Sequence, residues 1–363
     1  MKILHFVTGG FSGATQVAVD LCLASIQSND AEVLLVLRRK RNTDNARVQA
    51  LVKLGLNVQV VPGWSHMATI FALYKIAKNF QPDILAAHGF SEHLWGRYAG
   101  LLANVPNLVH IEHNSKERYS RWKLWQAKWL AKRTAAIIGV SEGVRNGLLE
   151  RGFPAEICKP IPNGINLDHF QEDALRPWDN REHTIIMASR FARQKDQSTL
   201  IEALGILKLK GIHPKLELAG LGKKRLIKKA QQQTLVLNLQ QQVQFLGQVK
   251  GLPSVLMNRQ IFILSTHYEG MPLALVEAMA AGCACIGTNV VGVREVIDDG
   301  INGLLVPEND AQALADAIEK LITKPEQARL IAQSAREKAI RCYGMSTMYK
   351  GYAALFREIT GTL

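Results

Sequence analysis

The chain has 363 residues, of which 47% are hydrophobic and 21% are charged, and its formal net charge is +13. This length allows two domains with separate cores, the composition is that of an ordinary globular protein, and no apolar run reaches the ~20 residues that a membrane-spanning helix needs. The positive charge favours an anionic partner, whether nucleic acid, an acidic lipid surface or a phosphorylated substrate.

The first expected element is a strand, because the N-terminal run MKILHFVTGG is too short for a signal peptide and leads into a glycine-rich turn. Alone, the spacing Gly9-Gly10-x-x-Gly13 is weak evidence, since many strand-to-helix turns use glycine to make the bend. A dinucleotide site would want an acid after the second strand, AEVLLVL, for the ribose hydroxyls. That strand runs instead into RRKR at 38–41, which weakens a dehydrogenase interpretation and leaves an NADP-type site open.

The rest of the first half alternates helices with the short apolar strands NVQVV, DILAAH, LVHIEH and AAIIGVS. This alternation predicts an α/β fold in which helices cover both faces of a parallel sheet. In such sheets ligands bind beyond the carboxyl ends of the strands. His88, His110, His113 and Ser141 follow or end strands there, although a histidine at a strand end is more often structural. His110 and His113 alternate differently along their strand, and we leave His110 unassigned.

Residues 116–133, KERYSRWKLWQAKWLAKR, read as a basic helix. Trp122, Trp125 and Trp129 fall at i, i+3 and i+7, on one face. That face is either buried under the sheet, with the cations in water, or it lies at a membrane surface with tryptophans at headgroup depth. The sequence does not decide between the two.

The second half repeats the strand, turn and helix order in HTIIMASRFARQKDQSTLIEAL. The polar stretch 171–183 before it has linker composition, so we place the domain boundary near 175. Arg190 and Lys195 lie in the turn after the new strand, where they are either solvated loop cations or part of an anion site. The repeat predicts a second Rossmann-like domain.

Residues 265–282, STHYEGMPLALVEAMAAG, follow the buried strand QIFIL and open a helix that Gly282 ends. Pro272 suits the first helical position, because it lacks the N–H that would be unsatisfied there. The N–H groups after it would form an anion site best suited to phosphate. Beside such a site, Glu269 is better placed to bind hydroxyls, and Glu277 stands among apolar residues where an unpaired carboxylate is costly. The plainer interpretation is an N-cap acid and a solvated helix acid.

The pattern E-G-x-P-L-x-x-x-E-A-M-A-x-G resembles the donor-sugar motif of the glycosyltransferase family 4 enzymes. The resemblance implies a GT-B architecture, in which two Rossmann-like parallel-sheet domains face a central cleft. Residues 1–175 would form the acceptor-binding domain, with the C-terminal helix 344–363 packing back onto it, and residues 176–343 the nucleotide-sugar-binding domain. In the family the first glutamate binds sugar hydroxyls and the second the ribose, roles that fall on Glu269 and Glu277.

Further residues take roles by the same resemblance. The pattern G-R-x-x-x-x-K, with Ser189 in place of the glycine, implies that Arg190 and Lys195 hold the donor diphosphate, and the histidine of LVHIEHN implies that His113 faces the reacting sugar. The catalytic candidates are therefore His113 and Glu269. The other expected diphosphate contacts are Gly10, Gly13, Met271, Pro272 and Leu273; the expected nucleoside contacts beside Glu277 are Gly220, Gly247 and Gln248; the expected acceptor or cleft residues are Ser12, His88 and Asn163. Glu295, in the closing motif, would favour a helix N-terminus.

The expected activity is that of a retaining, metal-independent hexosyltransferase with no cofactor. Its donor would be a nucleotide sugar and its acceptor a lipid-linked oligosaccharide or a surface polysaccharide such as lipopolysaccharide core, O-antigen or capsule. The five cysteines show no metal-site spacing, which suits a cytoplasmic protein, here peripheral at an anionic membrane surface on the inner face. The alternatives are a non-catalytic anion-binding or membrane-adaptor protein and a GT-B epimerase. Nucleic-acid binding is not expected, because the basic residues are dispersed.

Overall fold

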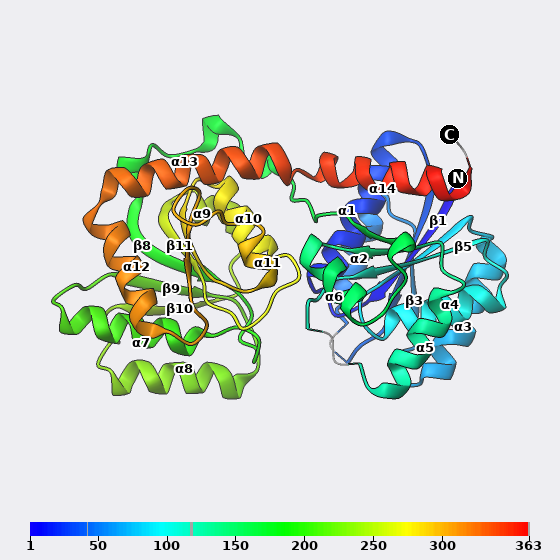
Figure 1. Ribbon diagram of the computed structural model, residues 1–363, viewed down its shortest axis with the longest axis horizontal. Helices are drawn as coiled ribbons and strands as arrows, with labels where there is room; N and C mark the ends of the chain where they lie inside the picture. The colour runs from blue at the N-terminus through cyan, green and yellow to red at the C-terminus, as the bar shows by residue number, and fades with distance from the viewer. Residues whose placement is uncertain (42, 117–118, 362–363) are drawn as a thin grey trace. The chain divides into compact units, whose positions relative to one another are not determined.

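The computed structural model describes residues 1–41, 43–116 and 119–361, and it divides the chain into two compact units (Figure 1). One unit comprises Met1–Gly164 and Met345–Leu363, the other Ile165–Gly344. The division falls before the boundary expected near 175. The reason is tertiary: the Ile165 N–H donates to the Tyr343 carbonyl at 2.9 Å, and the Phe170 carbonyl accepts from Arg336 at 2.9 Å. The polar stretch after Phe170 therefore lies inside the second unit.

The first unit contains a seven-stranded parallel sheet in the order β3-β2-β1-β4-β5-β6-β7. Its strands are β1 Lys2–Thr8, β2 Glu32–Arg38, β3 Val58–Val61, β4 Ile84–His88, β5 Asn107–Glu112, β6 Ala136–Gly139 and β7 Cys158–Pro160. Its α-helices are α1 Gly13–Ser28, α2 Asn45–Lys53, α3 His66–Phe80, α4 Glu92–Leu102, α5 Arg121–Ala131, α6 Glu142–Glu150 and α14 Met345–Thr360. The predicted helix-covered parallel sheet is confirmed.

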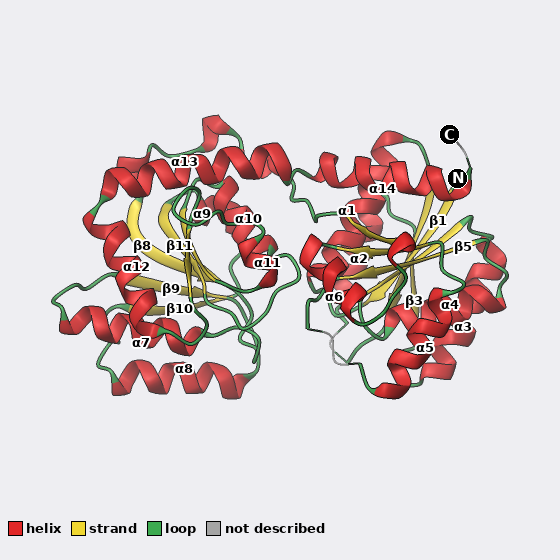
Figure 2. Ribbon diagram, in the orientation of Figure 1, coloured by secondary structure: helices red, strands yellow, loops and turns green. Residues whose placement is uncertain are grey.

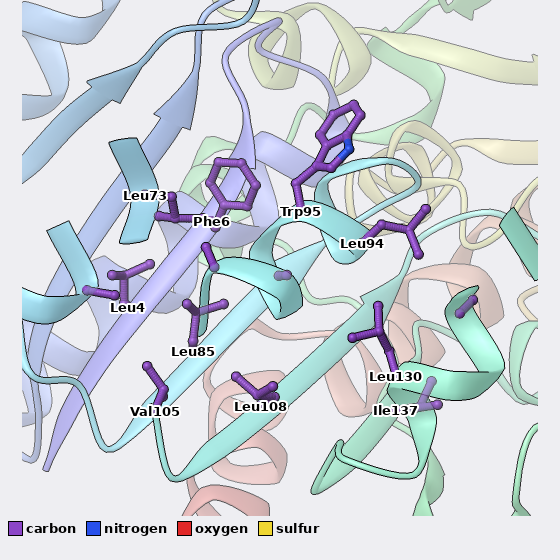
Figure 3. Packing of buried hydrophobic residues seen from close by; sticks show 14 of the residues in the cluster. Leu4, Phe6, Leu73, Leu85, Leu94, Trp95, Val105, Leu108, Leu130 and Ile137 are labelled. Atoms are coloured by element: carbon purple, nitrogen blue, oxygen red, sulfur yellow. The ribbon is translucent and has the colours of Figure 1, made fainter. Parts of the chain in front are cut away.

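Alternation along each strand divides the first unit's core between the two faces of its sheet. Leu4, Phe6 and Leu85 point into the cluster under α3, α4 and α5, where Leu73 and Leu130 meet them (Figure 3). The intervening positions of β1 face α1 and α14 on the other side, as the ring contact between His5 and Phe356 shows. Figure 2 shows helices on both sides of this sheet.

The second unit contains a six-stranded parallel sheet in the order β10-β9-β8-β11-β12-β13. Its strands are β8 Glu182–Ala188, β9 Lys215–Ala219, β10 Val243–Gly247, β11 Arg259–Leu264, β12 Ala284–Thr288 and β13 Leu304–Val306. Its α-helices are α7 Gln197–Leu209, α8 Lys224–Val236, α9 Leu252–Leu256, α10 Leu273–Ala280, α11 Val291–Arg294, α12 Ala311–Thr323 and α13 Pro325–Cys342. Short 3-10 turns occupy Ala155–Ile157 in the first unit and Leu167–Phe170, Glu172–Ala174 and Trp178–Asn180 in the second.

Helix α10 is strongly apolar apart from Glu277, and it carries the central motif of the sequence. Pro272 is its N-cap, with φ −82° and ψ 94°, and Leu273 is the first helical residue. The expected place of Pro272 inside the helix is thus wrong by one position, because its ψ is extended. Gly282 follows the helix end with φ +70°, and its N–H donates to the Met279 carbonyl at 2.9 Å, which closes the helix as predicted.

All five cysteines carry free thiols. Cys22, Cys158, Cys283 and Cys285 are buried, and burial raises the pKa of each of these four thiols. Among the residues that the structure describes, no helix has the length and apolar character needed to cross a bilayer.

Candidate functional site

Each sheet has a topological switch point, which is the place where successive strands begin to be added on the opposite side. Ligands of such sheets bind beyond the carboxyl ends of the strands at that point. In the second unit this place lies between β8 and β11, since β9 and β10 extend one side and β12 and β13 the other. In the first unit it lies between β1 and β4. The loops at these two places carry most of the polar residues singled out in the sequence.

Two loops at the switch point of the second unit are bonded to each other through their backbones. Lys195 and Thr266 form an isolated antiparallel bridge, the Asp196 N–H donates to the Ser265 carbonyl at 3.0 Å, and the His267 N–H donates to the Gln194 carbonyl at 2.8 Å. The loop after β8 is therefore fixed against the loop after β11. This contact brings Lys195 to the motif at 265–282.

The Lys195 ammonium donates to Oε1 of Glu269, and both side chains are largely buried, at 13% and 8% exposure. The Thr266 hydroxyl donates to the same oxygen at 2.9 Å. Glu269 thus has one oxygen held from two sides, while its position is fixed by the paired loops. The resemblance implies that Lys195 binds the diphosphate and Glu269 the sugar hydroxyls. In the structure the two side chains form an ion pair.

The start of α10 lies three residues beyond Gly270 and offers backbone donors. The N–H groups of Leu275 and Val276 donate to the Pro272 carbonyl at 3.0 and 3.2 Å. The donors left at the helix start are the N–H groups of Leu273 and Ala274, for which no acceptor lies within the described part of the chain. A helix start with two such donors favours an anion electrostatically. Met271 is buried beneath this turn.

Gly292 lets the backbone of α11 pack closely against the loop at 265–272, the motif loop. An added Cβ on Gly292, in α11, would lie 2.2 Å from the Gly270 carbonyl oxygen and 3.0 Å from that of Glu269. No side chain fits there, so the backbone of α11 can approach the loop only at a glycine. Glu295, by contrast, is the C-cap of α11, so the expectation that it stands at a helix N-terminus is wrong.

The loops after β8, β9 and β10 are also bonded in a row. The Ser189 N–H donates to the Ala219 carbonyl at 2.9 Å, and the Gly220 N–H donates to the Gly247 carbonyl at 2.7 Å. Gly220 has φ +136°, and a Cβ there would lie 2.0 Å from the Ser189 carbonyl oxygen. The predicted nucleoside contacts Gly220 and Gly247 are thus neighbours, and each has a left-handed or otherwise positive φ.

Arg190, Gln248 and Glu277 complete the set predicted for the second unit. Arg190 follows β8 and is exposed, and within the described residues its guanidinium forms no ion pair. Gln248 is exposed directly after Gly247. Glu277 is half-buried on the second turn of α10. The structure therefore gathers Arg190, Lys195, Glu269 and the α10 start at one end of the sheet, beside the glycine loops.

Three histidines form a row in the first unit. His5 Nδ1 lies 2.9 Å from His88 Nε2, and His88 Nδ1 lies 3.3 Å from His113 Nε2. His88 and His113 were predicted, and His5 was missed. The missing information was the pairing of β1 with β4, which sets His5 opposite Ala86, on the face that His88 shares. Burial lowers the pKa of His5 to about 4 and that of His113 to about 3, and it lowers the pKa of His88.

A second polar cluster lies on the opposite face of the same sheet and was also missed. The rings of His93 and His110 stack at 4.0 Å, and Arg97, fully buried, donates to the His93 carbonyl at 3.0 Å. Oε1 of Glu112 accepts from the His113 N–H at 2.9 Å, and burial raises the pKa of the Glu112 carboxyl. This places the unassigned His110 away from the histidine row.

The glycine loop of the first unit is built around Gly9 rather than Gly10. The Gly9 N–H donates to the Arg38 carbonyl at 2.7 Å, where a Cβ would also clash, whereas the nearest atom to a Cβ on Gly10 is 3.5 Å away. Ser12 is the N-cap of α1, and its N–H donates to the Thr15 hydroxyl at 3.1 Å. Gly13 is the first residue of the helix. Asn163 is buried at the end of the first unit.

The basic run after β2 has a structural partner. Arg38 and Lys40 each lie 3.2 Å from Oε1 of Glu92, and the Arg38 guanidinium also stacks 4.0 Å above the Trp95 ring. Arg38 is buried. These contacts give Arg38 and Lys40 a role inside the unit, which further weakens the NADP-type interpretation.

Helix α5 begins at Arg121, and part of the longer helix predicted over 116–133 falls on residues 117 and 118, outside the described residues. Trp122 is 65% and Trp125 55% exposed, with their rings stacked 4.8 Å apart. The interpretation as a face buried under the sheet is therefore wrong. Ala127 and Leu130 make the buried side instead.

Within the described residues, no three His, Cys, Asp or Glu side chains are arranged to hold a metal ion. Asp298 and Asp299 serve the loop before β13: Asp298 accepts from Lys338 at 2.7 Å, and Asp299 accepts from the Leu305 N–H at 2.8 Å.

Comparison with known proteins identifies the class. The family described as "Glycosyltransferase Family 4" matches residues 11–169, and the family described as "Glycosyl transferases group 1" matches residues 170–338. The structure of Anabaena HepE with UDP-glucose superposes with a TM-score of 0.86 at 23% identity and covers all of both chains. Two parallel-sheet units of this topology form the GT-B fold, and the two family models identify the chain as a glycosyltransferase. The chain belongs to the family 4 glycosyltransferases.

Curated relatives are similar over most of their length. The UDP-Gal:alpha-D-GlcNAc-diphosphoundecaprenol alpha-1,3-galactosyltransferase of Escherichia coli is 26% identical, over 83% of this chain and 81% of that protein. The alpha-maltose-1-phosphate synthase of Mycolicibacterium smegmatis is 25% identical, over 76% of this chain and 79% of that protein. These names point to different products, so the similarity identifies the kind of reaction and leaves the substrates to be argued.

Proposed function

We propose that this chain is a retaining, metal-independent hexosyltransferase that takes a sugar from a nucleotide-sugar donor and transfers it to a lipid-linked or surface-polysaccharide acceptor. The observation that carries the proposal is the pairing of Lys195 with Glu269 just before the start of α10. A cation, a carboxylate and two backbone N–H groups converge there, at the switch point of a parallel sheet. A sugar diphosphate presents the matching groups, namely anionic oxygens beside several hydroxyls.

The donor diphosphate is held by Arg190, by Lys195 and by the N–H groups of Leu273 and Ala274. When the bond from C1 of the sugar to the phosphate oxygen breaks, negative charge grows on the departing phosphate. Fixed cations and backbone donors stabilise that charge without reorganising. The second oxygen of Glu269 accepts hydrogen bonds from sugar hydroxyls, and Glu277 does the same for the ribose.

Retention of configuration follows if the acceptor attacks on the side from which the diphosphate leaves. The acceptor oxygen bonds to C1, and its proton passes to the departing phosphate oxygen, so no protein nucleophile is needed. A mechanism with a protein nucleophile would use a carboxylate close to C1 and a second acid about 5 Å away. Glu269 is instead held by Lys195 and Thr266 on the donor side. His113 contacts the reacting sugar. The proposal assigns no cofactor.

The relatives support the choice of substrates. The E. coli relative is named for galactose transfer from UDP to a diphosphoundecaprenol-linked sugar, and HepE was solved with UDP-glucose. A uridine donor and a lipid-linked acceptor are therefore the first candidates to test on this chain.

We place the enzyme at an anionic membrane surface on the cytoplasmic side. Trp122 and Trp125 on α5 and Met67 and Phe71 on α3 are all more than half exposed. Around the axis of its own helix, each pair lies about half a turn from the residues that the helix buries. Both pairs therefore point away from the sheet. Exposed cations flank the two pairs: Lys75, Lys78, Lys128, Lys132 and Arg133. Aromatic side chains beside cations are the composition of an interfacial helix.

The test measures nucleotide binding and product stereochemistry. Calorimetric titration with UDP, GDP and ADP is expected to give one preferred diphosphate, and Arg190→Ala to weaken its binding at least tenfold through loss of a charge-assisted contact. Arg193→Ala, an exposed arginine three residues further along the same loop, is the matched control and should bind normally.

Transfer from the preferred sugar conjugate to a lipid-linked acceptor should keep the anomeric configuration of the donor, as read by NMR, and should persist in EDTA. Failure of all three diphosphates to bind would overturn the donor assignment. An inverted product, or activity lost in EDTA and restored by a divalent cation, would overturn the proposed mechanism.

A further inference from the structure

The row of His5, His88 and His113 crosses three neighbouring strands of the first unit. The centroid of the His88 ring lies 5.2 Å from that of His5 and 5.5 Å from that of His113. His5 and His88 are each 1% exposed, and His113, at the end of the row, is half-buried. Two hydrogen-bond contacts therefore connect the interior of the unit to His113, the least buried ring of the row.

We propose that His5 and His88 are positioning residues, which hold the His113 ring in one orientation and one tautomer. The row itself is a property of the ligand-free protein. Its value for transfer rests on the proposed function, in which His113 contacts the reacting sugar.

The tautomers of the three rings are coupled. A hydrogen bond between two imidazoles needs one N–H and one lone pair. His88 uses both of its nitrogens, so a neutral row has two arrangements. If His5 donates to His88 and His88 to His113, the proton of His113 is on Nδ1. If every bond is reversed, Nδ1 of His113 carries the lone pair.

The outer nitrogen of His113 is thus a donor in one arrangement and an acceptor in the other. It changes only if all three rings change together. A ligand hydroxyl that contacts Nδ1 meets a fixed hydrogen-bonding group, because reversing that group alone would break the bond to His88.

Burial keeps the row neutral. The lowered pKa values of His5, His88 and His113 mean that a second proton on any of the rings is disfavoured near pH 7. The inner end of the row packs against Phe356 of α14, an apolar ring that offers no proton acceptor, so the arrangement in which His5 carries its proton on Nδ1 and donates to His88 is favoured over the reverse. The row is therefore suited to fixing a tautomer and unsuited to storing a proton.

The test compares two substitutions of His5 that differ in where they place a polar group. In His5→Asn the amide lies near the position of Nδ1, which bonds His88. In His5→Gln it lies near Nε2, which does not. His88→Leu removes both contacts. The ring-nitrogen NMR signals of His113 are read in each folded, ligand-free protein, and transfer is measured separately.

Wild type and His5→Asn should give a single His113 tautomer. His5→Gln and His88→Leu should give a mixture of tautomers and lower kcat severalfold, because only part of the population presents His113 in the competent tautomer and orientation, with the donor KM little changed. His110→Asn is the control, because His110 is as buried as His5 and His88 and lies on β5, the strand that leads to His113, but faces the other side of the sheet. It should leave His113 in a single tautomer, as in wild type.

His113 signals that are the same in His88→Leu as in wild type would overturn the positioning role. Signals that change while kcat stays constant would also overturn it, because the orientation of His113 would then not matter for transfer. Diphosphate binding by the second unit is measured independently, so this second outcome would leave the donor assignment standing.

Discussion

The ammonium of Lys195 is paired with the carboxylate of Glu269 across the switch point of the second sheet. Both residues lie in loops, so no helix or strand places one beside the other. The pairing depends on two loops joined by backbone hydrogen bonds, one after β8 and one after β11. Lys195 is therefore positioned before any ligand binds, and Glu269 has one of its two oxygens committed to the protein.

The first prediction concerns this pair. Glu269→Ala leaves the largely buried Lys195 ammonium without its partner, and breaking such a pair costs roughly 3–5 kcal/mol of unfolding free energy. Lys195→Met should cost a similar amount. The double variant Lys195→Met with Glu269→Ala should be more stable than the sum of the two losses predicts, because no charge is left alone. Urea unfolding of all variants gives the coupling free energy.

Transfer should be lost in each of these variants. Stability losses that simply add would mean that the pair does not form in solution. Transfer that survives in Glu269→Ala would remove this glutamate from the site.

The second prediction concerns Gly292. A methyl group there would meet the Gly270 carbonyl oxygen at 2.2 Å, so Gly292→Ala must displace the motif loop or α11. We expect a loss of about 1–3 kcal/mol in unfolding free energy, typical of overpacking, together with weaker diphosphate binding. Thermal unfolding and calorimetric titration measure the two effects.

Gly147→Ala in α6 is the matched control. Its added methyl meets the end of the Arg151 side chain at 3.0 Å and the Ser115 carbonyl oxygen at 3.9 Å, which is an ordinary contact, and alanine is the better helix former. Normal diphosphate affinity in Gly292→Ala would show that the position of the motif loop is not critical.

The order of strands, turns and the motif of the second unit could be predicted from the sequence, because strand length, glycine position and apolar runs are local properties. The row of histidines could not. His5 reads as one polar residue in an apolar strand, and only the pairing of β1 with β4 places it beside His88. Register between strands that are distant in sequence is set by the whole core. The same holds for the Lys195–Glu269 pair, whose members are 74 residues apart.

Helix α5 shows a second limit of pattern analysis. The spacing of Trp122, Trp125 and Trp129 correctly places them on one face, but it does not say what lies against that face. The small residues Ala127 and Ala131 pack toward the unit's interior with Leu130, and the tryptophans point outward. Composition misleads in a similar way at the domain boundary, since residues 171–183 are polar yet belong to the second unit through the contact between Phe170 and Arg336.

The third prediction concerns these exposed rings. Trp122→Ser with Trp125→Ser should reduce binding to vesicles that contain anionic lipid at least tenfold, because both rings lose their place among the headgroups. Leu209→Ser is the control, since Leu209 is 91% exposed in the second unit and outside the proposed surface. Vesicle flotation measures binding, and light scattering reports the mass in solution. Equal flotation of the double variant and wild type, or dimers of wild type that the double variant abolishes, would contradict membrane docking.

The fourth prediction is that acid destabilises the first unit well above the pH at which most carboxylates titrate. Burial lowers the pKa of five histidines there: His5, His88, His93, His110 and His113. In the unfolded chain these rings take up protons near pH 6.5, while the folded unit does not. Above about pH 7 the rings are neutral in both states and do not reduce the free energy of unfolding. Below that pH the free energy of unfolding falls, by up to ~1.4 kcal/mol per pH unit for each ring.

Glu112 acts in the opposite direction, because burial raises its pKa and the folded form keeps a proton that the unfolded form loses. One carboxyl does not offset five rings, so urea midpoints should be clearly lower at pH 5 than at pH 7.5. Tryptophan fluorescence suits the measurement, because five of the six tryptophans lie in the first unit. His110→Asn removes one of the five rings and should make the loss with pH less steep. Equal midpoints at the two pH values would show that the histidines are protonated in the folded protein, and a neutral row of His5, His88 and His113 would then be untenable.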